Sequence, residues 1–249
     1  MLFRSHVQFR EQQLMTVRGH RDKEAPKLDK LEYGIQALVA PLFPRDRLIP
    51  YYELREFCER QFAEHARTHN SVMRLKDITH VDEGICAYVD LNAYQRTLRY
   101  FFEFTSYGTC LVSFYVAKFG EPEPNQVYIR VEHTMRIALI SLDLCMFFLD
   151  KARFRGSRWA QISASNLGNT QIDREIPGCC PFKQSVSCSN KLQTTLSTQS
   201  VISSVDNGCE MRNLLVEFVG RLVHLYGAYS ESYDCAKALY DIVTKETET

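Results

Sequence analysis

The sequence has no excess of charge of either sign, because its 30 basic residues are balanced by 30 acidic ones. This balance gives no overall electrostatic attraction to nucleic acid or to an anionic membrane. We therefore expect no nucleic-acid partner. The first 30 residues carry a local basic surplus, which leaves a peripheral membrane contact as an open alternative. At 249 residues the chain is long enough to bury a core.

Segments typical of export and membrane insertion are also missing. The N-terminal stretch MLFRSHVQFREQQ has no continuous apolar core of the kind found in signal peptides. No uncharged apolar run reaches the length of about 20 residues that a membrane-spanning helix needs. We expect a cytoplasmic protein, with attachment to the surface of an intracellular membrane as the alternative.

No CxxC pair occurs among the nine cysteines, which argues against a zinc ribbon or a thioredoxin-like motif. His65 and His69 are one helical turn apart but would supply only two metal ligands. We therefore expect neither a metal nor a cofactor. Most cysteines lie in apolar runs and are expected to be buried thiols of a reducing compartment. These are Cys58, Cys86, Cys110, Cys145 and Cys235.

Motifs of the common catalytic sites are absent as well. The sequence contains no phosphate-binding loop, dinucleotide fingerprint, nucleophile elbow or paired zinc ligands. Asp90, Glu103, His133 and Asp143 lie near apolar segments, but their spacing does not bring them together in one pocket. We expect a protein that is not an enzyme and has no catalytic residues. A helical enzyme with a site assembled from distant residues stays an alternative.

The most apolar stretch is YFFEFTSYGTCLVSFYVAKFG, residues 100–120. No charged side chain occurs between Glu103 and Lys118, and the apolar residues cover every face at helical spacing. A helix that is apolar all round must be enclosed by other elements. The stretch therefore predicts a buried central helix, and the apolar residues 137–149 predict its partner in a helical hairpin. We expect an all-α helical bundle.

Four regions follow from the changes in composition along the chain. Residues 1–30 are expected to be a flexible arm, and residues 31–162 the helical core, including amphipathic helices at 31–42 and after Pro50. Residues 163–208 are rich in Ser, Thr and Asn and predict a disordered insert. Residues 209–249 predict C-terminal helices that pack on the core.

Three short motifs, in order, resemble those of the B-cell lymphoma two family of apoptosis regulators. Residues 54–62, LREFCERQF, are similar to the third homology motif of that family. Residues 101–114, FFEFTSYGTCLVSF, are similar to the first motif, and Gly156-Ser157-Arg158-Trp159 to the second. The chain departs from the family pattern at Thr109, where the family has arginine, and at Cys58 and Glu59, which replace glycine and aspartate.

The resemblance implies an apoptosis regulator that binds a partner's amphipathic helix in a hydrophobic groove, with homodimers or heterodimers as further expectations. An adaptor or structural interaction protein with an unrelated partner is the alternative. The resemblance places the groove at Tyr94, Leu98, Phe101, Phe102, Tyr107, Gly108, Leu111 and Phe114. It places the death-motif-like helix face at Leu54, Phe57, Cys58, Glu59 and Phe62.

Overall fold

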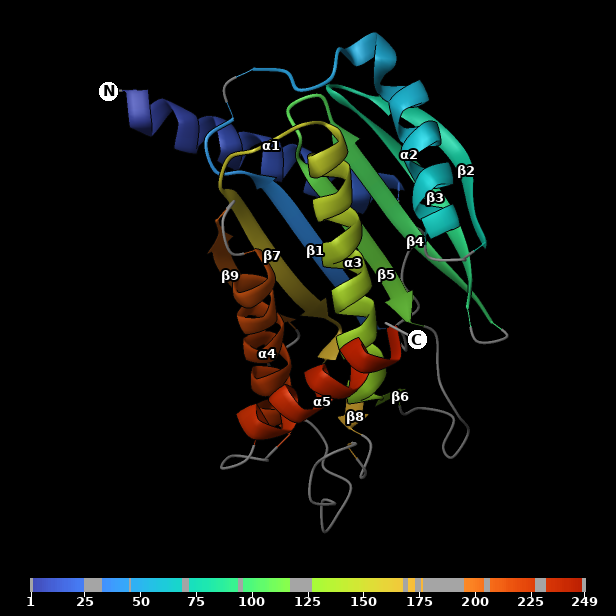
Figure 1. The fold of residues 1–249 in the computed structure, drawn as a ribbon, viewed down its shortest axis with the longest axis vertical. Helices are drawn as coiled ribbons and strands as arrows, with labels where there is room; N and C mark the ends of the chain where they lie inside the picture. The colour runs from blue at the N-terminus through green and yellow to red at the C-terminus, as the bar shows by residue number, and fades with distance from the viewer. Residues whose placement is uncertain are drawn as a thin grey trace.

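A seven-stranded antiparallel sheet forms the centre of the protein in a computed structural model (Figure 1). The structure describes residues 2–24, 33–44, 46–68, 72–93, 96–116, 127–167, 170–172, 176, 195–203, 207–226 and 232–247. The strand order is β2-β3-β4-β5-β1-β7-β9, and β6 pairs with β8 in a separate parallel pair. The expected all-α fold is therefore wrong.

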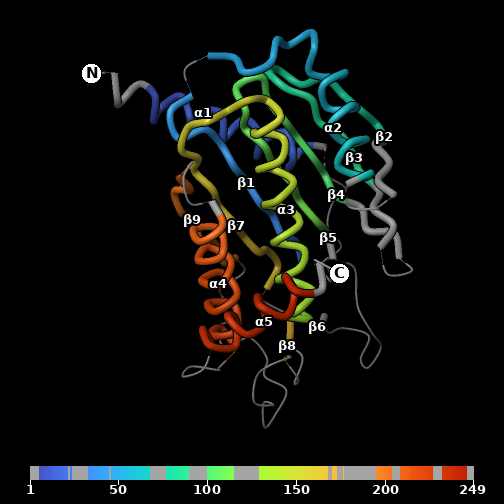
Figure 2. The backbone as a smooth tube through the Cα atoms, viewed as in Figure 1, coloured from blue at the N-terminus to red at the C-terminus, as the bar shows by residue number. Residues whose placement is uncertain are grey.

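The elements follow one another as α1 (Leu2–Glu24), β1 (Tyr33–Pro41), the short 3-10 helix η1 (Tyr51–Glu53), α2 (Leu54–Thr68), β2 (Val72–Val81), β3 (Gly84–Ala93), β4 (Arg96–Thr105), β5 (Cys110–Val116), β6 (Val127–Ile129), α3 (Val131–Lys151), β7 (Arg158–Ser165), β8 (Thr170–Ile172), β9 (Thr195–Ile202), α4 (Asn207–Leu225) and α5 (Ser232–Thr247). Figure 1 shows α2, α3 and α4 along one face of the sheet, with α5 across the lower end of α3. Helix α1 lies on the opposite face, and Figure 2 traces the chain from there to α5.

The stretch expected to be the central helix is a hairpin of two buried strands, β4 and β5. Its turn contains Gly108, which has φ +83° and whose missing side chain leaves room for Leu48 and Leu149. The run is apolar on every side because helices cover both faces of the sheet at this point. A short apolar run buried on both faces has no period that separates a strand from a helix, which explains the error.

The same cause explains two further corrections. Residues 33–41, within an expected helix, form the central strand β1, and all nine of them are buried. Within the expected helical core, residues 84–105 form β3 and β4, which pair antiparallel with each other in the seven-stranded sheet. The helical hairpin is consequently absent, because only its second half, α3, is a helix.

Several helices predicted from periodicity are confirmed. Helix α2 follows Pro50, α3 includes the apolar residues 137–149, and α4 and α5 lie within residues 207–247. In α2, α4 and α5, charged residues separate the apolar positions at helical spacing, whereas the strands that were mistaken for helices are apolar on both faces.

The two regions expected to lack structure contain regular elements. Where a flexible arm was expected, residues 2–24 form α1, with Leu14 and Val17 buried. Within residues 163–208, the described parts include the end of β7, the short β8 and the edge strand β9. Residues 177–194, with Cys179, Cys180 and Cys188, lie outside the described residues.

The main core lies between the sheet and helices α2 to α5. Phe148 of α3 is fully buried, and its ring centroid lies 4.8 Å from that of Phe102 and 4.9 Å from that of Phe62. Four cysteines predicted to be buried are buried thiols: Cys58, Cys86, Cys110 and Cys145. Cys235 is buried too, but it is disulfide-bonded rather than reduced. None of the helices in the described ranges combines the length and hydropathy needed to cross a membrane.

Candidate interaction surface

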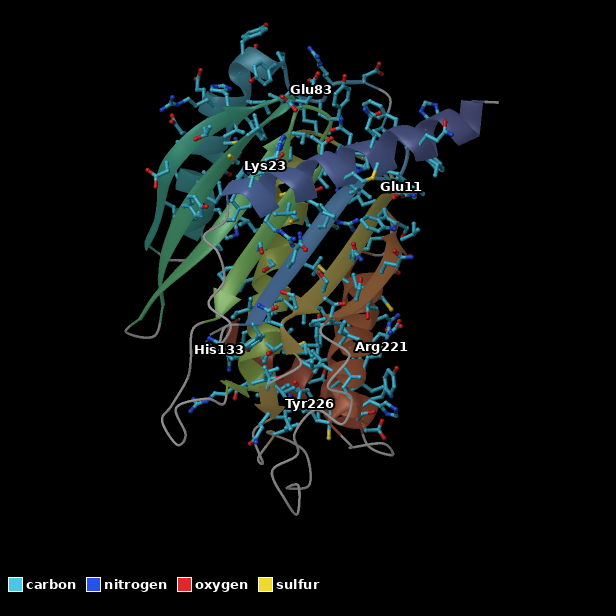
Figure 3. The ribbon with its side chains drawn as sticks, turned by 180° about the vertical axis from the view of Figure 1, so that it is seen from behind. Glu11, Lys23, Glu83, His133, Arg221 and Tyr226 are labelled. Atoms are coloured by element: carbon cyan, nitrogen blue, oxygen red, sulfur yellow. The ribbon has the colours of Figure 1, made fainter. Side chains whose placement is uncertain are left out.

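Helix α1 crosses the second face of the sheet and encloses a separate apolar cluster (Figure 3). Leu14 and Val17, one helical turn apart, are its two fully buried apolar side chains among those described. They pack against an apolar patch drawn from β1, β3, β4, β5 and β7, which we call the α1-facing strip. The strip consists of Leu38, Ala40, Cys86, Phe101, Leu111 and Trp159.

Strand alternation explains how the strip arises from the same residues as the main core. Successive side chains of a strand point to opposite faces. In β4, Phe101 therefore faces α1, whereas Phe102 packs in the main core against α2 and α3. In β5, Leu111 faces α1 and Phe114 stacks on Tyr100 in the main core, with ring centroids 4.5 Å apart.

An acidic pair lies at the end of the strip that meets the last turns of α1. His20 Nδ1 lies 2.9 Å from Glu103 Oε1, and His20 Nε2 lies 3.6 Å from Asp82 Oδ2. Glu103 belongs to β4, between Cys86 of β3 and Leu111 of β5. Asp82 is in the turn between β2 and β3 and is exposed. One imidazole thus connects α1 to two carboxyl groups of the sheet.

Glu103 is the most deeply buried carboxyl group of this surface, with no exposed area. Burial raises its pKa to about 7, although the hydrogen bond to His20 and the charge of that ring act in the opposite direction. The Asp82 carboxylate contributes further to the rise. Glu103 Oε2 has no hydrogen-bond partner in the structure. A buried carboxylate with one unsatisfied oxygen favours an additional donor or a stronger cation.

Aromatic side chains contact the first half of α1. The Arg10 guanidinium lies over the Trp159 ring, 5.7 Å from its centroid. The Phe9 ring meets Tyr107 edge to face, at a centroid separation of 4.9 Å. The Tyr107 ring also lies beneath the guanidinium of Arg47, 5.8 Å away. Cations over aromatic faces are attracted by the ring quadrupole, so this end favours a basic helix.

Two arginines of α1 bind neutral side chains of the sheet. Arg18 donates to Gln161 Oε1 of β7, and Arg21 donates to Gln36 Oε1 of β1 at 2.8 Å. These contacts join α1 to two neighbouring strands of the sheet. A hydrogen bond with a charged donor contributes about 1.5–3 kcal/mol.

No family model, curated protein or solved structure matches this chain.

The residues that the resemblance assigned to a groove are divided between several places. Phe101 and Leu111 belong to the α1-facing strip, while Phe102 and Phe114 belong to the main core. Tyr107 and Gly108 form the β4–β5 turn. Leu98 lies in β4, where its side chain is not described, and Tyr94 lies outside the described residues.

The second set of assigned residues lies on α2. Four of them are buried against the main core: Leu54, Phe57, Cys58 and Phe62. Glu59 is exposed and accepts a hydrogen bond from Arg55. This face of α2 is therefore occupied by the sheet and α3.

The sequence indicates Glu103 as a titratable residue but does not reveal its partner. His20 is 83 positions away, and only the packing of α1 across β4 brings the two together. A charge inside an apolar run is the one signal that pointed to Glu103. Of the other residues considered, His65 is buried beside Phe147, and His69 lies outside the described residues. Within the described ranges no group of three or more His, Cys, Asp or Glu is arranged to hold a metal ion.

Proposed function

We propose that this protein is a non-enzymatic interaction protein whose α1-facing strip binds an amphipathic helix. Helix α1 occupies the strip in the free chain, and a partner's helix replaces it in the complex. The observation that carries the proposal is the manner in which α1 is attached. This single helix lies across five strands, and among its described side chains Leu14 and Val17 are the fully buried apolar ones.

The small apolar contact of α1 favours its replacement by a partner's helix. Burying a Leu or Val side chain contributes about 1.5–3 kcal/mol, so the two residues together contribute about 3–6 kcal/mol. By contrast, α3 contributes ten buried apolar residues to the main core. Helix α1 therefore has a much smaller apolar contact with the sheet than α3 has, and elements with few buried apolar contacts can open without global unfolding. The α1-facing strip would then present an apolar patch with a charged end to a partner.

The proposal retains binding of an amphipathic helix, which was expected from sequence, and changes its geometry. The helix lies on a sheet face rather than in a groove between helices. The link to apoptosis stays a prediction, as does dimer formation. An adaptor role with an unrelated partner agrees equally well with this surface.

A peptide-exchange experiment tests the proposal with the full-length chain. In the chain, the double substitution Leu14→Glu and Val17→Glu should release α1 while leaving the α1-facing strip intact, because both side chains belong to α1. A labelled peptide of residues 2–24 should then bind this variant saturably. The single tryptophan, Trp159, lies in the strip and reports occupancy by its fluorescence.

Met15 provides the matched control, because its side chain is 65% exposed between the two buried residues. A peptide with Met15→Glu should bind like the unmodified peptide, and a peptide with Leu14→Glu should not bind. Absence of saturable binding to a double variant that keeps its native circular dichroism would refute the proposed function.

A further inference from the structure

We infer that the partner helix is basic, with one cation at each end of a two-residue apolar contact. This inference deepens the proposed function and rests on it. In α1 the corresponding positions are Arg10, Leu14, Val17 and His20, which place a guanidinium, two apolar residues and an imidazole on one face.

The acidic end of the strip has more acceptor capacity than His20 uses. One ring nitrogen meets Glu103 and the other faces Asp82, while Glu103 Oε2 has no partner. A guanidinium carries five N–H donors in a planar fork and can bind a carboxylate through two of them. Arginine at the position of His20 therefore suits this end better than histidine does.

The aromatic end selects for the same charge. Trp159 is mostly buried, and the face of its ring is covered by the Arg10 guanidinium. Tryptophan offers the strongest cation–π attraction of the aromatic side chains. The two cation subsites are separated by the apolar residues of the strip, so charge and apolar contacts must match together.

An acidic helix would be rejected at the same two places. A carboxylate at the position of His20 would lie beside the buried Glu103 and close to Asp82. Like charges brought together at an interface weaken binding, and rejection of this kind is a common source of specificity. Helix α1 itself carries five basic residues and three acidic ones, in agreement with this selection.

Peptide variants at pH 8 test the inference on the full-length Leu14→Glu, Val17→Glu chain. The peptide of residues 2–24 with His20→Arg should bind at least as tightly as the unmodified peptide. The peptide with His20→Glu should bind at least 10-fold more weakly. Gln12→Glu adds the same charge on the exposed face and should leave the affinity unchanged. Glu103→Gln in the chain should remove most of the difference between the His20→Arg and His20→Glu peptides.

The outcomes separate the two proposals. If no peptide binds, the proposed function fails, and the inference fails with it. If the His20→Glu and Gln12→Glu peptides bind equally well, the strip binds helices without charge selection, and only the inference is overturned. A concentration-dependent dimer of the unmodified chain in sedimentation, absent after Leu14→Glu and Val17→Glu, would assign the strip to α1 of a second copy and overturn the inference of a separate partner.

Discussion

Replacing Glu103 by glutamine should change how the stability of this protein depends on pH. Glutamine keeps the size and one acceptor of the side chain but carries no titratable proton. In the folded protein the pKa of Glu103 is raised from 4.5 to about 7, chiefly because the carboxyl is buried beneath α1. The folded state therefore binds this proton more tightly than the unfolded state.

Proton linkage gives the sign and the size of the effect of Glu103 on stability. A group whose pKa is raised in the folded state stabilises the protein fully only below its unfolded pKa. The free energy of unfolding therefore falls as the pH rises from about 4.5 to about 7. One pH unit of this difference corresponds to about 1.4 kcal/mol. Between pH 5 and pH 8, Glu103 should lower the free energy of unfolding by about 2.5 kcal/mol relative to glutamine.

Urea unfolding at pH 5 and pH 8, at fixed ionic strength, measures this quantity. Between pH 5 and pH 8, the free energy of unfolding of Glu103→Gln should rise by about 2.5 kcal/mol relative to that of the unmodified protein. The matched control is Glu56→Gln on α2, whose side chain is 84% exposed and whose profile should stay parallel to that of the unmodified protein. Profiles of Glu103→Gln and the unmodified protein that run parallel within about 0.5 kcal/mol would refute the reasoning.

Two further substitutions test the neighbours that shift the pKa of Glu103. The ring of His20 lowers the pKa of Glu103, and Asp82 raises it. With His20→Gln, the pKa of Glu103 should rise, and the pH at which stability falls should move upward. With Asp82→Asn, that pH should move downward. Measuring the carboxyl titration of each variant by NMR checks both directions.

Three further predictions concern the rest of the fold. Gly108→Ala should destabilise the protein by about 1–3 kcal/mol in urea unfolding, because φ is positive there and a Cβ would lie 2.5 Å from Leu48 Cδ1; an unchanged midpoint would contradict the turn geometry. Phe148→Ala should lower the unfolding free energy by about 3–5 kcal/mol, measured in the same way, because it empties the centre of the main core. Alkylation of the native protein, followed by mass spectrometry, should modify the exposed Cys209 well before the fully buried Cys110, whose pKa burial also raises; equal rates would contradict the burial.

The sequence by itself determined the helices that carry a long amphipathic or apolar pattern. Helix α2 repeats buried residues such as Leu54, Phe57 and Phe62 at helical spacing, and α3 extends over 21 residues. In α2, charged residues alternate with the buried ones at helical spacing, and this amphipathic pattern separates a helix from a strand buried on both faces. The sequence also indicated Glu103 as a titratable residue near an apolar segment, but it did not distinguish Glu103 from Asp90, His133 and Asp143.

Only the tertiary structure decided that the most apolar segments are strands. Tyr33–Pro41 and the hairpin around Gly108 are apolar on both faces because α1 covers one side of the sheet and α3 the other. Burial on both faces erases the two-residue alternation that identifies a strand. The pairing of His20 with Glu103 was equally hidden. It depends on where α1 crosses β4, and that crossing is set by contacts between residues far apart in the chain.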